Sequence, residues 1–192
     1  MAVDTRAWAR VRHEGGSCEG AADRHLSAEL LEQGLAEASV SFVEHWGAVE
    51  ALVIRPPGGG RKQPIQGSIS VDGGLIGDRW AEGKASPGDQ ISVMNLDVAA
   101  VIANGQSIVL FGDNIFTRLD LRDSILPVGT QLHLGGALVE VSAMPHPPCG
   151  QFRDRFGAAA FALAAKDSRV RGIYMTVLQG GDVAIGDPFV RA

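Results

Sequence analysis

One cysteine stands in a proline-rich stretch, just before a segment whose pattern predicts a helix. Residues 144–150 read Met-Pro-His-Pro-Pro-Cys-Gly, and Arg153 and Arg155 follow Cys149 within two turns. Prolines fix the backbone and remove amide donors, so the stretch predicts a stiff extended loop that cannot join a sheet. A helix N-terminus and nearby arginines stabilise a thiolate. Cys149 is therefore a candidate nucleophile or soft-metal ligand, with a buried structural cysteine as the alternative.

Further short segments surround Cys149 in a fixed order. They lie at residues 77–80, 111–115, 126–132, 135–141, 171–174 and 180–187. In this order and at these spacings they resemble the MOSC family, named for the C-terminal domain of molybdenum cofactor sulfurases. The resemblance covers roughly residues 47–190. It implies a MOSC domain at residues 47–192 with a β-barrel core, preceded by an N-terminal extension at residues 1–46.

The resemblance also implies a cofactor. In the reductase branch of the family the corresponding cysteine ligates molybdenum, and the enzyme reduces N-hydroxylated compounds. A molybdenum pterin brings two dithiolene sulfurs of its own, so the protein need add only one thiolate, which suits this thiophilic metal. The resemblance thus makes Cys149 both the metal ligand and a catalytic residue.

The remaining site residues follow from motif position. The phosphate of the pterin requires cations or backbone donors, and Arg79, Arg171 and Arg153 are the candidates. Asn114 matches a family position near the cofactor and would bond the pterin edge. His146 would donate a hydrogen bond to a metal oxo group or to substrate, which makes it the second catalytic candidate.

The sequence departs from the reductase branch beside the cysteine. Two prolines precede Cys149 and Gly150-Gln151 follow it, where that branch often carries polar or basic residues. The segment between Arg79 and Gln90 also lacks the histidine-rich run of the standalone members that detoxify hydroxylaminopurines. The chain is closer to small bacterial standalone MOSC proteins of unassigned substrate.

Composition narrows the class of partner. The 192 residues carry a net charge of −5, which offers no electrostatic footprint for nucleic acid or an anionic membrane. No apolar run suggests a signal peptide or membrane span, so a soluble, cytoplasmic protein is expected. Two cysteines argue against a disulfide framework. Cys18 is interpreted as a bystander, because its spacing to His13 and His25 matches no zinc pattern.

The N-terminal extension divides into two parts. Residues 1–24 are charged and glycine-rich without periodicity, and are expected to be poorly ordered. From residue 27 to about 38, Leu30, Leu31 and Leu35 recur at helical spacing and predict an amphipathic helix. This helix would pack on the outside of the main domain or on a second subunit in a homo-oligomer, or, as the favoured alternative, merely cover an exposed sheet edge.

The body of the chain reads as mainly β with a few helices. A strand at 49–54 is expected to pair with 65–71 across a turn at 56–60, and Asn95 to cap a helix reaching residue 103 or 104. Short strands with few crossing helices favour a closed or nearly closed barrel. The other predicted elements are strands at 91–94, 108–111, 115–121 and 173–178, a hairpin of 131–134 with 137–141, and a helix at 152–165.

Three functions stay open on sequence grounds, and whether the protein is an enzyme stays undecided with them. The first is a molybdenum-cofactor reductase of N–O or S–O bonds, acting on a small-molecule substrate with electrons from a separate protein. The second is a sulfur carrier that receives a Cys149 persulfide from a cysteine desulfurase. The third is a non-catalytic barrel that binds a small molecule. The first two need the same accessible thiolate.

Overall fold

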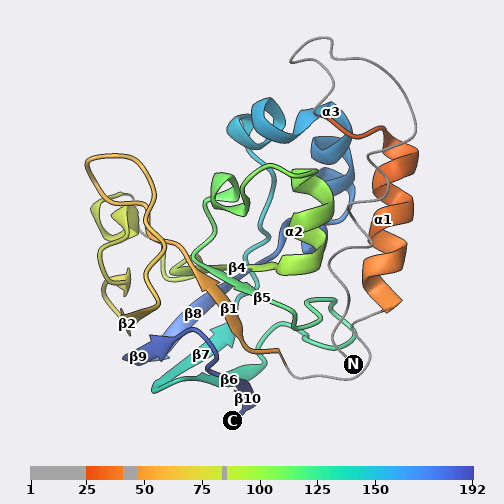
Figure 1. Cartoon of the computed structure of the whole chain (residues 1–192). Coiled ribbons are helices and arrows are strands. Elements are labelled where there is room, and N and C mark those ends of the chain that lie inside the picture. The colour runs from red at the N-terminus through yellow and green to blue at the C-terminus, as the bar shows by residue number, and fades with distance from the viewer. Residues whose placement is uncertain (1–24, 41–46, 84–85) are drawn as a thin grey trace.

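The computed structural model describes residues 25–40, 47–83 and 86–192 (Figure 1). The predictions for residues 1–24, including Cys18, lie outside these ranges. The helical elements are α1 (Ala28–Val40), η4 (Arg79–Glu82), α2 (Leu96–Ala103), η5 (Ile108–Phe111), α3 (Gly150–Lys166) and α4 (Ser168–Arg171). The strands are β1 (Val49–Leu52), β2 (Gln66–Ser70), β3 (Gly74–Leu75), β4 (Ile91–Asn95), β5 (Ile115–Thr117), β6 (Gln131–Leu134), β7 (Ala137–Val141), β8 (Ile173–Gln179), β9 (Gly181–Ala184) and β10 (Phe189–Arg191).

The larger sheet is a nearly closed barrel. Its order is β1-β5-β4-β8-β7-β6-β10, and its pairs are antiparallel except for β4 with β5. The outer strands β1 and β10 approach each other, since Ala48 bridges Pro188 and the amide of Val49 donates to Asp187 O at 2.9 Å. The smaller sheet, β3-β2-β9, adds Ile69 and Val183 to the same hydrophobic core. The mainly β, barrel-like fold predicted from the sequence is confirmed.

A second core lies between the barrel and the helices. It joins Leu31 of α1 and Met94 of β4 to the aromatic side chains Phe111, Phe152 and Phe156. Phe111 stacks on Phe156 with ring centroids 4.1 Å apart. Figure 1 shows α1, α2 and α3 gathered on one side of the molecule. This core places the start of α3, and therefore Cys149, beside the barrel.

The N-terminal helix was predicted correctly, and it packs on the main domain as one alternative had it, but its buried face differs from expectation. Leu31 is 1% exposed, whereas Leu30, expected on the same apolar stripe, is 51% exposed. The helix packs on α2 and α3 instead of on a sheet edge. Its apolar face is thus covered within the chain, and the predicted homo-oligomer stays untested.

Two strand predictions were wrong. The segment 65–71 does not return on 49–54: β1 pairs with β5, while β2 pairs with β3 and β9. Only a single bridge from Ile54 to Lys62 closes the Pro-Gly turn. Residues 108–111 form the 3₁₀ helix η5, because the Ser107 side chain accepts from the amide of Val109 and Gly112 ends the turn at φ 77°. An apolar run alone cannot distinguish these conformations.

Locally specified elements were predicted well. Asn95 caps α2 by accepting from two backbone amides, β6 and β7 form the expected hairpin, and β8 spans Ile173–Gln179. The predicted strand 115–121 is shorter, ending at Thr117 as β5. Across the described ranges, none of the helices has the length and apolar character that crossing a membrane requires.

Candidate functional site

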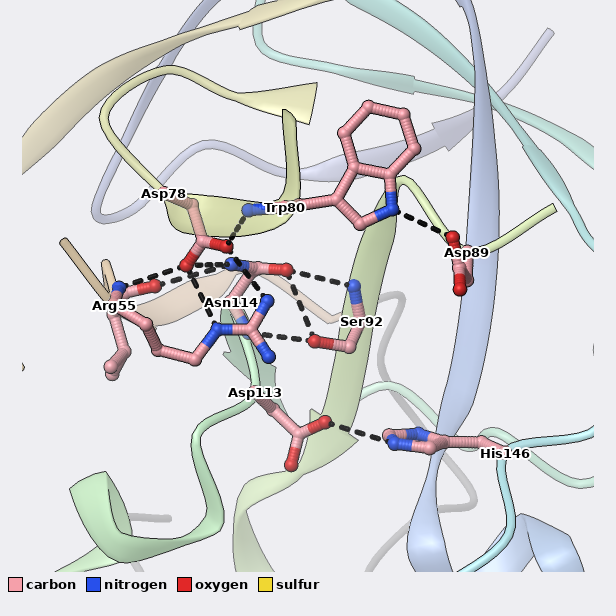
Figure 2. A network of polar contacts seen from close by, with 9 residues as sticks. Arg55, Asp78, Trp80, Asp89, Ser92, Asp113, Asn114 and His146 are labelled. Carbon is pink, nitrogen blue, oxygen red and sulfur yellow. Dashed lines mark hydrogen bonds and ion pairs between the residues drawn. The ribbon is translucent and has the colours of Figure 1, made fainter. Parts of the chain in front are cut away.

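Two adjoining cavities open on one side of the barrel and share Arg55, Trp80 and Asp89. The outer cavity has a volume of about 260 Å³ and is completed by Arg79 and Gly83. The inner cavity has a volume of about 90 Å³ and is lined in addition by Ser92, Gly112, Asp113, His146, Arg171 and Tyr174. Figure 2 shows the polar contacts around them. The cavities bring together side chains from distant parts of the chain.

Arg55 and Asp78 form the wall shared by the cavities. Asp78 Oδ2 accepts from the Arg55 backbone amide at 2.8 Å and from Nε at 2.9 Å, while Oδ1 accepts from Nη2 at 2.8 Å. Burial raises the pKa of Asp78, but the hydrogen bonds from Arg55 outweigh it and lower the pKa overall. The carboxylate therefore stays ionised and holds the guanidinium against the pocket.

Asn114 supports this wall from behind. Its Oδ1 accepts from the Ser92 amide and hydroxyl, both at 3.1 Å, and its Nδ2 donates to Asp78 Oδ2 at 3.1 Å. The side chain is buried, and Figure 2 shows it between Asp78 and Ser92. Asn114 thus positions Asp78, and its contact with a pterin stays a prediction.

A second charged group lines the inner cavity. Arg171 Nη1 donates to Asp113 Oδ2 at 2.5 Å, and Asp113 Oδ1 lies 3.7 Å from His146 Nε2. The imidazole stacks on Tyr174 with ring centroids 4.1 Å apart. Burial lowers the pKa of His146 to about 3; Asp113 opposes this, while Arg171 and Arg55 reinforce it. His146 is neutral at ordinary pH, and burial also raises the pKa of Tyr174.

The backbone around Arg171 is possible because a glycine follows it. Gly172 has φ 104°, and a Cβ placed there would lie 2.2 Å from Val93 O. The chain can therefore turn from α4 into β8 with Arg171 directed at Asp113. The guanidinium lies 5.3 Å from the ring centroid of Phe152 in α3, which adds a cation–π contact.

Four arginines form one group: Arg55 and Arg61 lie beside Gly112, and the charges of Arg79 and Arg155 act on Arg61. Burial lowers the pKa of Arg61, and the charges of Arg155, Arg79 and Arg55 lower it further. A Cβ at Gly112 would lie at ordinary contact distance, 3.5 Å from Arg55 Cδ and 3.6 Å from Arg61 Nη2, and it is the positive φ of 77° that favours glycine there. Mutual repulsion among cations is relieved by a bound anion. This arginine group is a candidate anion site.

Cys149 begins α3 and is exposed. It takes the N-cap position, and its side chain makes no capping hydrogen bond. It lines neither cavity, and neither does the exposed Arg153. Three residues before it, His146 lines the inner cavity, and three residues after it, Phe152 contacts Arg171. A span of three residues cannot exceed about 11 Å, so the Cα atom of Cys149 lies within that distance of the Cα atom of His146.

The predicted site residues therefore fall into four sets, one of which is Cys149 with Arg153, outside both cavities. His146 and Arg171 meet in the inner cavity, Arg79 lines the outer cavity, and Asn114 lies buried behind the wall. The sequence analysis missed Arg55, Arg61, Trp80, Asp113, Arg155 and Tyr174. Asp113 and Trp80 stood within segments already singled out, at 111–115 and 77–80, so their position beside Asn114 and Arg79 was an available signal. Arg55 and Arg61 lie on either side of a turn, and the sequence around them gave no signal of a role in the site.

The fold and the site define a β-barrel protein with a cation-lined polar pocket beside an accessible thiol. The model of the MOSC domain family matches residues 97–190. Residues 97–190 therefore form a MOSC domain.

Solved structures agree in fold. YiiM from Escherichia coli is 21% identical with a TM-score of 0.52, over 74% of this chain and 69% of that one. YiiM from Geobacillus stearothermophilus is 18% identical with a TM-score of 0.54, over 76% and 75%. The YUAD protein from Bacillus subtilis is 20% identical with a TM-score of 0.55, over 74% and 93%. No curated protein matches the sequence significantly.

Proposed function

We propose that this protein binds a molybdenum pterin cofactor and reduces small N–O or S–O compounds with electrons from a separate protein. The observation that carries the proposal is the arginine group around Gly112 in a chain whose net charge is −5. Three further arginines act by charge on Arg61 in an acidic protein, and although Arg55 is paired with Asp78, this concentration of cations supports an anionic ligand.

The residues fit such a cofactor at both of its ends. Arg61 Nε is buried without a hydrogen-bond partner among the described residues. Its N–H is therefore available to donate a hydrogen bond to a phosphate. Arg79 is exposed and faces the same space, and Arg155 extends the group to α3. At the other end, the exposed Cys149 offers a thiolate close to the inner cavity.

The chain's own residues would bind the cofactor and orient it. The arginine group would hold the phosphate, with Arg55 kept in place by Asp78. Cys149 would supply the protein ligand to molybdenum, and the bound cofactor would supply the redox chemistry. Because the pKa of His146 is lowered to about 3 by burial first, this residue would act through a neutral N–H or lone pair and not as a stored proton. The two protons consumed by each reduction would enter from solvent.

Metal content tests the proposal. The full chain would be purified from a molybdenum-replete host, and its molybdenum and absorption spectrum measured. Cys149→Ser is expected to lose bound metal and reductase activity while keeping the melting temperature of the unchanged chain measured without cofactor, because an exposed side chain contributes little to stability. Cys18→Ser is the matched control and should behave like the unchanged chain. Full metal content in Cys149→Ser would refute the role of Cys149 as ligand.

A sulfur carrier is the second candidate, favoured by the exposure of Cys149 and its free side chain at the start of α3. The rate of alkylation at Cys149 distinguishes a metal-binding reductase from a sulfur carrier. A thiolate bound to metal should react slowly in the loaded protein and rapidly once the cofactor is removed. A carrier should instead gain one sulfur atom at Cys149 from a cysteine desulfurase and cysteine, and lose it to a thiol reductant.

A further inference from the structure

The inner cavity contains unsatisfied polar atoms that the arginine group does not explain. His146 Nδ1, Arg171 Nε and Asp113 Oδ1 are buried, and none has a hydrogen-bond partner among the described residues. All three residues are at least nine-tenths buried and line the same cavity. Buried polar groups without partners are costly, so a molecule bound in the cavity is expected to satisfy them.

The position of the His146 proton decides what these atoms offer. Nε2 faces the Asp113 carboxylate at 3.7 Å, which is too long for a good hydrogen bond but close enough for the negative charge to favour a proton there. A neutral imidazole carries one proton, so Nδ1 is left as an acceptor. Arg171 Nε is always a donor. Besides Asp113 Oδ1, which faces the Nε2 proton, the cavity therefore presents one acceptor, His146 Nδ1, and one donor, Arg171 Nε.

The charges around the cavity balance. Its lining contains two arginines, Arg55 and Arg171, and two aspartates, Asp89 and Asp113. Each arginine is joined to a carboxylate, Arg55 to Asp78 and Arg171 to Asp113. An anion would gain little net attraction here, in contrast to the arginine group around Gly112. Space for about 90 Å³ suits a group of a few heavy atoms.

We propose that the inner cavity binds a compact neutral group that accepts a hydrogen bond from Arg171 Nε and donates one to His146 Nδ1, as an amide-like group does. This makes the inner cavity a second subsite, which adjoins the anion site of the arginine group and shares Arg55 and Gly112 with it. Its assignment to the reacting end of the substrate rests on the proposed function, whereas the binding itself does not.

Three ligands of equal size test the pairing on the full chain without cofactor. Acetamide has a donor and an acceptor, acetone has an acceptor only, and acetate is an anion. With histidine labelled by ¹⁵N, His146 should show a proton on Nε2, and acetamide should shift the Nδ1 resonance. Acetamide should bind at least about threefold more tightly than acetone, the effect of one hydrogen bond. Acetate should not bind there.

A variant and an internal control complete the experiment. His146→Phe keeps an aromatic ring to stack on Tyr174 but removes Nδ1, so the preference for acetamide over acetone should disappear. His133 lies exposed on β6, and its resonance should not move. A proton on Nδ1, equal shifts from acetate, or no shift with acetamide would overturn the proposal. Because no metal is involved, these outcomes are independent of the molybdenum content of Cys149→Ser.

Discussion

Asp78 accepts three hydrogen bonds from Arg55, one from its backbone amide and two from its guanidinium, at 2.8 to 2.9 Å. The carboxylate is 1% exposed in its side chain and the arginine 25% exposed. The pair thus fixes the direction of a cation that faces both cavities. The stability of the pocket wall should depend on the charge of Asp78.

Acid should weaken this wall. Although burial raises the pKa of Asp78, the bonds from Arg55 lower it below the unfolded value of about 3.9. The stabilisation is therefore present above about pH 4 and lost as pH falls below it. Asp78→Asn should destabilise the protein at neutral pH by on the order of 3 kcal/mol, since it leaves Arg55 without its counter-charge. Urea unfolding at pH 7 and 3.5 measures the loss of stability in acid and the effect of Asp78→Asn. Asp123→Asn, which removes the charge from an exposed ion pair, is the control.

His146 should make stability depend on pH in a different window. Its folded pKa, lowered to about 3 by burial, lies below its unfolded value of about 6.5. Stability is then complete above pH 6.5 and falls by about 1.4 kcal/mol for each pH unit below it, until about pH 3. His146→Gln should lose this slope between pH 6 and 5 in urea unfolding, whereas His133→Gln should retain it. An unchanged slope in His146→Gln would show that the imidazole is not held neutral.

Alanine substitutions of two adjacent leucines in α1 should change the free energy of unfolding by very different amounts. Leu31 is fully buried in the second core, and Leu30 is half exposed. Leu31→Ala should cost about 2–4 kcal/mol, because it removes buried methyl groups and leaves a cavity. Leu30→Ala should change stability by less than about 0.5 kcal/mol. Chemical unfolding of both variants tests whether α1 is an integral part of the domain; equal, small effects would argue that it is not.

The kink in α3 should depend on a glycine. Gly157 has φ 90°, and a Cβ there would lie 2.6 Å from Cγ of His25. Gly157→Ala should destabilise the protein by about 1–3 kcal/mol through backbone strain and steric clash. Gly150→Ala, where a Cβ meets nothing within 4 Å, should be neutral or slightly stabilising, because alanine favours a helix. Melting temperatures of the two variants distinguish these effects.

Features set by neighbouring residues could be predicted from the sequence by itself. The cap of α2 depends on Asn95 and the two amides that follow it, and the hairpin of β6 and β7 depends on Gly135 and Gly136. The proline-rich loop before α3 follows likewise from prolines at positions 145, 147 and 148. The family could be identified because its short segments retain their order and spacing.

Only the tertiary structure decided which side chains meet. Arg55 bonds to Asp78 across 23 residues, and Arg171 bonds to Asp113 across 58. Arg61 joins the arginine group because its side chain lies beside Gly112, and β1 pairs with β5 instead of with the next strand along the chain. Such contacts depend on how the barrel closes and how the helices pack against it. Local backbone preference carries no information about either, so the cavities and their charge balance emerge only when the chain is folded.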